Sequence, residues 1–312
     1  MQYRVVLGRK LSAVAFGADR IRTADLPKAF DFLDTYLAYG GNFIDTARIY
    51  GFGDCEAALG RWLVNGGNRD KVFLGTKGGH PEISSMHTGR LSRNELEFDI
   101  LHSLDALKTD HVDMYYLHRD DTSRPVADIL ETLNLFLQKG YARHIGVSNW
   151  RAGRIAEAQK YAAAHGLTGF SADQPQFSLA RQHTVIDDTL VEMDSRLYEY
   201  HKQTNMMCVC YSSQAKGYFM KLQNGDPLPE LTRRMFDCDG NRQIYDRIAA
   251  AGADACAVSL SYVLRQPFPT FAIAGSSTLA QLEQTLKCVD SAVNGPDVSG
   301  LRILSETQNR DN

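Results

Sequence analysis

Two kinds of segment alternate along the whole chain, and this alternation limits the fold more than any other feature of the sequence. One kind is a short run of apolar and β-branched residues with few polar interruptions. Such runs are typical of parallel strands that are buried on both faces of a sheet. The predicted strands are Val14–Gly17, Phe43–Ala47, Val72–Thr76, Val112–His118, His144–Asn149, Phe170–Gln174, Cys208–Ser212 and Thr270–Gly275.

The other kind of segment has the apolar spacing of an amphipathic helix. Asp25–Tyr39, for example, carries its apolar residues on one stripe and is followed by two glycines, which commonly end a helix. Ser92 and Glu95 have the spacing of a capping box, which predicts a helix start. The predicted helices are Asp25–Tyr39, Ser92–Leu107, Pro125–Gly140, Arg151–His165, Val185–Lys202, Asp254–Arg265 and Leu279–Val289.

Strands that are each followed by helical material predict a (β/α)₈ barrel. The competing α/β fold is an open doubly wound sheet, which favours a glycine-rich turn after its first strand. No GxGxxG motif occurs in the chain, and no linker rich in glycine, serine and proline divides it. We therefore expect a single α/β barrel domain over residues 1–312.

Composition and charge exclude several classes of partner. The net charge of -3, with no basic cluster among aromatic residues, argues against nucleic acid. Apolar stretches fall far short of the roughly 20 residues that cross a membrane, and the first residues lack the apolar core of a signal peptide. We expect a cytoplasmic protein with buried free thiols. No metal site is expected, because neither the cysteines nor His80 and His87 lie within a zinc-binding pattern.

In a (β/α)₈ barrel the active site lies at the C-terminal ends of the strands. Asp45 closes one predicted strand, Tyr50 lies in the loop that follows it, and Lys77 and His118 close two others. Each residue type taken singly is more often structural than catalytic. Together at strand ends, the four are predicted to form one catalytic group.

The chemistry of carbonyl reduction gives each of these residues a role. The reaction needs a hydride on carbon and a proton on oxygen. A phenol with a pKa of about 10 is a poor acid at neutral pH unless its anion is stabilised. Lys77 would stabilise the Tyr50 anion, and Asp45 would hold the ammonium. His118 would either orient the substrate oxygen through a hydrogen bond or assist the proton transfer.

At these residues the chain resembles an aldo-keto reductase, and the similarity extends over nearly its whole length. The stretch NFIDTARIY is similar to that family's Asp-to-Tyr pattern, and GTK and YYLHR match its lysine and histidine positions. In this family a nicotinamide dinucleotide binds across the barrel mouth without a Rossmann domain. The resemblance therefore implies an oxidoreductase that interconverts a small-molecule carbonyl and an alcohol.

Further segments resemble the cofactor site of the family. Ser148 and Asn149 in HIGVSNW would contact the nicotinamide carboxamide, with Gln174 in SADQPQFSL as the third partner. Tyr211 in VCYSSQAKG would stack on the nicotinamide ring, and Lys216 would contact the pyrophosphate. The other cofactor contacts implied by the resemblance are Gly17, Ala18, Ser212, Ser213, Gln214, Gly275, Ser276, Ser277, Thr278, Gln281 and Thr285.

The adenosine end departs from the pattern of the family. Ser276, Ser277 and Thr278 precede a predicted helix, whose first N–H groups suit a phosphate. Gly275 and Gln281 stand where the family often has a lysine and an arginine beside the 2′-phosphate. Loss of both cations weakens selection for NADP, although hydroxyl and amide groups still suit a phosphate. We favour NADP as the cofactor, with NAD as the alternative.

The substrate pocket is expected to lie on loops. Asp19 and the charged residues 119–121 hint at a hydroxylated substrate such as a sugar, whereas Trp150 has an alternative role in packing beneath its loop. The sequence does not distinguish a monomer from a homo-oligomer. The residues expected to border the pocket are Phe16, Asp19, Tyr50, His80, His118, Trp150 and Phe219.

Two rival functions remain beside the reductase. A barrel of this family could bind NADP and act mainly as a regulatory or redox-sensing subunit, but the intact catalytic group favours turnover. A barrel lyase or isomerase with Lys77 as a Schiff base would leave the predicted nicotinamide site around Ser148 and Tyr211 without a purpose.

Overall fold

The computed structural model, which describes residues 1–294 and 299–301, confirms the predicted barrel. Eight parallel strands close into a ring in the order β10, β3, β4, β5, β6, β7, β8, β9. All the predicted strands are present, with small shifts at their ends. The barrel strands are β3 (Val14–Gly17), β4 (Phe43–Asp45), β5 (Phe73–Gly78), β6 (Val112–Leu117), β7 (Ala142–Ser148), β8 (Ala172–Gln174), β9 (Met207–Cys210) and β10 (Thr270–Ala274).

The strand register brings the side chains of Asp45 and Lys77 to one face of the barrel wall. Asp45, the last residue of β4, pairs with Gly75 of β5. Because side chains alternate along a strand, Lys77 points to the same face as Gly75. Lys77 is therefore the nearest side chain on β5 that can reach the Asp45 carboxylate.

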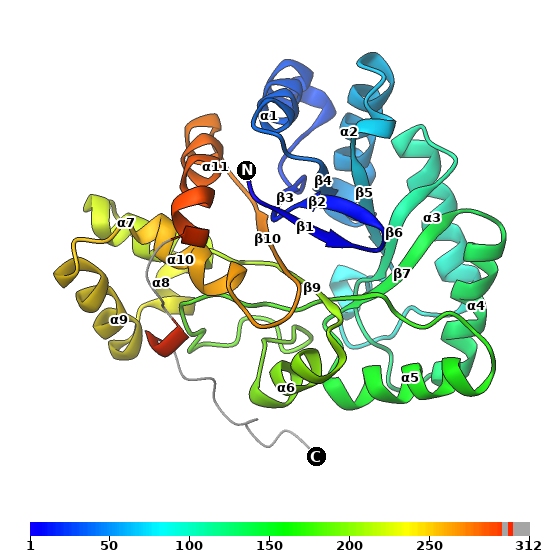
Figure 1. Cartoon of the computed structure of the whole chain (residues 1–312). Helices are drawn as coiled ribbons and strands as arrows, with labels where there is room; N and C mark the ends of the chain where they lie inside the picture. The colour runs from blue at the N-terminus through cyan, green and yellow to red at the C-terminus, as the bar shows by residue number, and fades with distance from the viewer. Residues whose placement is uncertain (295–298, 302–312) are drawn as a thin grey trace.

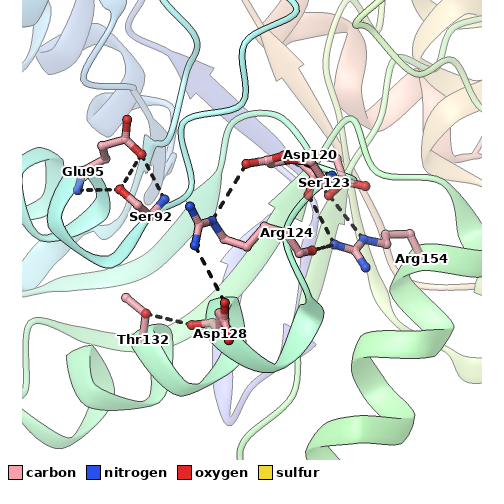
Figure 2. Close-up of polar contacts among 9 residues, drawn as sticks. Ser92, Glu95, Asp120, Ser123, Arg124, Asp128, Thr132 and Arg154 are labelled. Atoms are coloured by element: carbon pink, nitrogen blue, oxygen red, sulfur yellow. Dashed lines mark hydrogen bonds and ion pairs between the residues drawn. The ribbon is translucent and has the colours of Figure 1, made fainter.

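Helices cover the outside of the barrel (Figure 1). The predicted capping box begins α3, where the Ser92 hydroxyl accepts from the backbone N–H of Glu95 and the Glu95 carboxylate accepts from that of Ser92 (Figure 2). The predicted helices confirmed with similar bounds are α1 (Leu26–Ala38), α3 (Arg93–Leu107), α4 (Val126–Gln138), α5 (Ala152–Ala164), α10 (Ala255–Leu264) and α11 (Leu279–Asn294).

The prediction of a helix over Val185–Lys202 is wrong in its first half, because α6 spans only Ser195–Thr204. The Asp187 carboxylate accepts hydrogen bonds from the backbone N–H and the hydroxyl of Thr189. Such a local turn competes with helix formation. Asp194 then caps the first turn of α6, as an acidic residue at a helix start commonly does.

Several elements were not predicted from the sequence. Two of them, the strands β1 and β2, form an antiparallel hairpin at the N-terminus. The unpredicted elements are β1 (Tyr3–Val6), β2 (Arg9–Ser12), α2 (Asp54–Asn65), α7 (Tyr218–Asn224), α8 (Glu230–Phe236) and α9 (Asp239–Ala250).

The hairpin closes the N-terminal end of the barrel, which faces the viewer in Figure 1. Leu11 of β2 is buried in one cluster with Phe43, Phe73 and Phe271, which lie at the starts of their strands. The ring of Phe43 meets those of Phe73 and Phe271 edge to face, at 5.2 and 5.6 Å between centroids. With this end filled, a ligand can reach the barrel axis only from the C-terminal end.

The structure also bears on the expectations drawn from composition. All six cysteines are free thiols, and five of them are buried, as predicted. No group of three or more metal-ligating side chains is found among the described residues. In the same part of the chain no single helix is long and apolar enough to cross a membrane. The pair α9 and α10 has that length and composition but is bent by 114° at its break.

Candidate active site

The four residues predicted to be catalytic lie together at the C-terminal end of the barrel. Asp45 ends β4, Lys77 lies near the end of β5, and His118 directly follows β6. The Lys77 ammonium donates to the Asp45 carboxylate at 2.6 Å and to the Tyr50 hydroxyl at 3.4 Å. The rings of Tyr50 and His118 meet edge to face with their centroids 5.7 Å apart.

The loop that carries Tyr50 is fixed to the neighbouring strand. The backbone N–H of Arg48 donates to the carbonyl of Lys77 at 2.9 Å, and that of Tyr50 donates to the carbonyl of Ala47 at 3.0 Å. Lys77 in turn donates to the carbonyl of Thr46 at 2.7 Å. The position of the Tyr50 ring therefore depends on the same strand that carries the ammonium.

Lys77 is fully buried, and its charge is maintained by its partners. Burial alone would lower the pKa of this ammonium, but the Asp45 carboxylate and the Tyr50 hydroxyl outweigh it and raise the pKa. A buried cation thus lies within hydrogen-bonding distance of a phenol. Such a cation favours the phenolate that forms when the hydroxyl gives up its proton.

The two rings that would face a carbonyl group are both neutral near pH 7. Burial raises the pKa of Tyr50 above its ordinary value, although Lys77 opposes this effect. Burial, together with Lys77 and Arg119, lowers the pKa of His118 well below its ordinary value. Tyr50 therefore retains its proton, and His118 is a neutral imidazole that can donate one hydrogen bond.

The side chains predicted to hold the carboxamide form a continuous hydrogen-bonded chain. The Ser148 hydroxyl donates to the backbone carbonyl of Gln174 at 2.7 Å and accepts from the Asn149 side-chain amide at 3.1 Å. The Tyr211 hydroxyl donates to the Asn149 amide oxygen at 2.7 Å. At the other end, the Gln174 amide donates to the Asp45 carboxylate at 2.9 Å. This chain joins the predicted nicotinamide site to the Asp45–Lys77 ion pair.

A cleft of about 770 Å³ begins at Asp45 and Tyr50 and extends to Gln284 and Thr285 on α11. Most of the predicted cofactor contacts border it. Those that line the cleft are Gly17, Tyr211, Ser212, Ser213, Gln214, Lys216, Gly275, Ser276, Ser277, Gln281 and Thr285. The predicted contacts that are not among its lining residues are Ala18, Ser148, Asn149, Gln174 and Thr278.

The far end of the cleft is built from hydroxyl and amide groups at the start of α11. The Gln281 side chain accepts from the backbone N–H of Ser277 at 2.9 Å, and the Thr278 hydroxyl accepts from the N–H of Gln281 at 3.3 Å. The Thr285 hydroxyl donates to the side chain of Gln214 at 3.3 Å. Gly275 and Gln281, which line this end of the cleft, add no positive charge to it.

Two cations in the cleft were missed by the sequence analysis, Arg20 and Lys221. They lie near Lys216. Burial lowers the pKa of Lys216 and of Lys221, and the positive charge of Arg20 has a smaller effect in the same direction. Arg20 could have been found, because it lies in the loop after the first barrel strand, beside Asp19. Lys221 could not, because the helix α7 that carries it was not predicted.

The residues expected around the substrate divide into two groups. The His80 ring meets that of His118 at 4.9 Å between centroids, and Asp19 lines the cleft. Trp150 is fully buried with its ring 5.3 Å from that of Phe170, which agrees with the packing role that the sequence left open for it. The rings of Phe16 and Phe219 are also buried. Phe16 borders a smaller hollow of about 380 Å³ beside α1.

The charged residues 119–121 form hydrogen bonds and an ion pair that hold the loop after β6 in place. Arg119 is buried and donates to the hydroxyl of Thr189 at 2.9 Å and to the His118 carbonyl at 2.9 Å. Arg154 of α5 reaches back to the Asp120 carboxylate at 3.5 Å, and to backbone carbonyls of the same loop (Figure 2). These charges are engaged within the protein, so they give no reason to expect a sugar.

Known proteins resemble the chain in sequence over most of its length. An aryl-alcohol dehydrogenase of Pestalotiopsis microspora is 26% identical over 86% of this chain and 70% of its own. A norsolorinic acid reductase of Emericella nidulans is 28% identical over 88% of this chain and 72% of its own. An uncharacterized oxidoreductase of Bacillus subtilis is 28% identical over 95% of this chain and 90% of its own.

A sequence model of the aldo/keto reductase family matches residues 13–304, which include every strand of the barrel. The match agrees with the closed barrel of eight parallel strands and with the oxidoreductases among the relatives. The chain belongs to the aldo/keto reductase family.

Proposed function

We propose that the protein reduces a carbonyl group to an alcohol, and oxidises the alcohol in reverse, with a nicotinamide nucleotide and with Tyr50 as the proton donor. The observation that carries the proposal is the contact between the buried Lys77 ammonium and the Tyr50 hydroxyl at the end of a long cleft. A phenol, a buried cation and a cleft in this arrangement suit acid catalysis beside a bound dinucleotide.

The residues of the cleft fit a nicotinamide dinucleotide. Tyr211 offers an aromatic ring, Arg20 and Lys216 offer positive charge in the lining of the cleft, and Ser276 and Ser277 lie just before a helix. The bound nucleotide would supply the hydride. Positive charge in the lining of the cleft suits the pyrophosphate that links the two halves of such a molecule.

Each catalytic residue then has one task. Tyr50 gives its proton to the substrate oxygen, and Lys77 stabilises the phenolate that this transfer leaves. Asp45 keeps Lys77 charged and in place. Of the two roles that the sequence leaves open for His118, we propose hydrogen-bond donation to the substrate oxygen, because an imidazole with a strongly lowered pKa carries no second proton to transfer at neutral pH.

The alternative is a regulatory or redox-sensing subunit that binds the nucleotide with little turnover. Mixing the protein and NADPH with 4-nitrobenzaldehyde or 9,10-phenanthrenequinone tests the two functions. The reductase predicts a fall in NADPH absorbance at a rate proportional to enzyme concentration. Tight NADPH binding without oxidation by any member of a carbonyl panel would favour the regulatory subunit.

We also propose NADP as the favoured nucleotide, held at its 2′-phosphate by hydroxyl and N–H groups before α11. The double variant Ser276→Ala, Thr278→Ala should weaken NADPH binding by about 10-fold or more, because hydrogen bonds to charged groups contribute roughly 1.5–3 kcal/mol. NADH lacks this phosphate, so its affinity should change much less. Fluorescence titration with both nucleotides measures the ratio, and an equal loss for both would place the phosphate elsewhere.

A further inference from the structure

The hollow of about 380 Å³ is a second cavity, and it adjoins the cofactor cleft. Its lining comes from the loop after β3, from α1 and from the residues before α11. It shares four lining residues with the cleft, Gly17, Arg20, Ser276 and Ser277. The two cavities therefore meet at Arg20 and at the two serines that precede α11.

Positive charge outweighs negative charge in the lining of the hollow. Arg20, Arg22 and Lys28 line it, whereas Asp25 is the one acid that lines it in the described part of the chain. The Asp25 carboxylate caps α1 by accepting from the backbone N–H of Lys28 at 3.3 Å. A cavity lined mainly by one sign of charge attracts ligands of the opposite sign. The hollow therefore suits an anion.

Arg22 is held in place by partners that carry no charge. Its guanidinium donates through Nη1 to the backbone carbonyls of Asp19 and Ile21, each at 2.8 Å, and to the Cys55 sulfur at 2.7 Å. Burial raises the pKa of the Cys55 thiol to about 12, although the charge of Arg22 opposes the shift. The sulfur is therefore neutral near pH 7. A guanidinium fixed by neutral partners keeps its positive charge for a ligand.

The other two cations of the hollow are also available to an anion. Lys28 is exposed on the first turn of α1, and within the described residues its ammonium has no hydrogen bond or ion pair. Arg20 lies 3.9 Å from the Asp19 carboxylate, and about half of each side chain is exposed. An exposed pair of this kind contributes little free energy, so Arg20 can exchange it for a ligand.

The cations of the two cavities form two groups. Lys216 and Lys221 line the cleft but not the hollow. Arg22 and Lys28 line the hollow but not the cleft, and Arg20 lines both. NADP carries phosphate in two places, the pyrophosphate and the 2′-phosphate. The cations of the cleft suit the pyrophosphate, and those of the hollow adjoin the serines proposed to hold the 2′-phosphate.

We infer that the hollow receives the 2′-phosphate of NADP, with Arg20, Arg22 and Lys28 as the cations that bind it. This inference rests on the proposed nicotinamide cofactor. Gly275 and Gln281, on the loop after β10 and on α11, add no positive charge. The loop after β3 and the first turn of α1 then supply the charge that distinguishes NADP from NAD, since a phosphate binds cations more strongly than a hydroxyl does.

Lys28→Glu tests the inference by reversing one charge of the hollow. A glutamate suits the first turn of a helix, so α1 should be preserved. The dissociation constant for NADPH should rise by about 10-fold or more, because a hydrogen bond to a charged group is lost and repulsion is added. NADH lacks the 2′-phosphate, and its dissociation constant should stay within about 2-fold of wild type. Fluorescence titration of the full chain measures both.

Lys160→Glu is the matched control, because Lys160 is an exposed lysine on α5 that lines neither cavity. Both nucleotides should bind this variant as they bind the wild type. An equal loss of NADPH and NADH affinity in Lys28→Glu, or no loss of either, would overturn the hollow as the 2′-phosphate site.

Ligands without a nicotinamide isolate the phosphate itself. The nucleotides 2′,5′-ADP and 5′-AMP differ only in the 2′-phosphate. Wild-type protein should release NADPH at a concentration of 2′,5′-ADP about 10-fold lower than that of 5′-AMP, and Lys28→Glu should abolish the difference. Inorganic phosphate represents a free phosphate ligand. Phosphate binding that depends on Lys28, beside an NADPH affinity that does not, would make the hollow a separate anion site and overturn the inference.

Turnover separates failure of the hollow from failure of the reductase. If Lys28→Glu binds NADPH as the wild type does and both oxidise it with 9,10-phenanthrenequinone, the hollow is wrong and the reductase stands. If Lys28→Glu loses NADPH affinity selectively but the wild type oxidises no NADPH with any carbonyl, the hollow stands and the regulatory subunit is favoured. A wild-type protein that binds neither nucleotide would remove both proposals.

Discussion

Tyr50→Phe is expected to lower kcat/KM for carbonyl reduction by about 10²–10⁴-fold, the usual contribution of a general acid. The substitution removes the hydroxyl that Lys77 contacts at 3.4 Å and retains the ring against His118. No other phenol lies within reach of the Lys77 ammonium in the described part of the chain. The proton for the substrate oxygen would then have to come from water or from a neutral His118.

Nucleotide affinity separates this catalytic effect from a structural one. The Tyr50 hydroxyl is bonded to Lys77, whereas Lys216 and the residues before α11, which would hold the phosphates, belong to other elements of the cleft. The dissociation constant for NADPH should therefore remain within about 2-fold of wild type, a difference of roughly 0.4 kcal/mol. Tyr161→Phe is the control, because Tyr161 bonds Glu131 on the outer helices. Wild-type turnover by Tyr50→Phe would eliminate Tyr50 as the acid.

The strands and the meeting of the Asp45 and Lys77 side chains could be predicted because each depends on a local pattern. A strand buried on both faces must be apolar along its length, as Val14–Gly17 is. The ends of parallel strands meet at one edge of a barrel, so Asp45 and Lys77 had to be neighbours once the fold was assigned. The register that sets their contact, through Gly75, is known only from the structure.

Other features depend on contacts between distant residues, which the sequence does not reveal. Trp150 follows a strand end, as a pocket residue would, but Phe170 and Arg154 pack against its ring and keep it beneath the loop. An arginine in a loop is expected to be exposed, but Arg119 is buried because Thr189 on another loop accepts its hydrogen bond. The hairpin was missed because Arg9 and Lys10 interrupt the apolar pattern of β2.

A second large effect is expected from Glu56, a buried residue of α2 that was not identified from the sequence. Its carboxylate accepts from the Thr76 hydroxyl at 2.5 Å. Burial raises the pKa of Glu56 from 4.5 to about 7, although the hydrogen bond from Thr76, the nearby Ser103 hydroxyl and the charge of Arg48 oppose the shift. The folded protein therefore binds this proton more tightly than the unfolded chain does.

The sign of the pH dependence follows from that difference. The bound proton contributes its full stability below pH 4.5, and this contribution is lost as the pH rises to about 7. At about 1.36 kcal/mol per pH unit, Glu56 should make the wild type about 2–3 kcal/mol less stable at pH 8 than at pH 5. Glu56→Gln cannot titrate and retains an acceptor for Thr76, so the variant should gain that amount relative to wild type over the same interval.

Urea unfolding of both proteins at about pH 5 and pH 8 measures this relative gain, because other titrating groups contribute equally to both and cancel in the comparison. Glu199→Gln is the control, since Glu199 is an exposed glutamate on α6, and its stability should follow the wild type at both pH values. Parallel pH profiles for wild type and Glu56→Gln would mean that the carboxylate is solvated or fully paired. A gain confined to pH 8 would instead identify Glu56 as a buried acid that the fold holds in its protonated form below about pH 7.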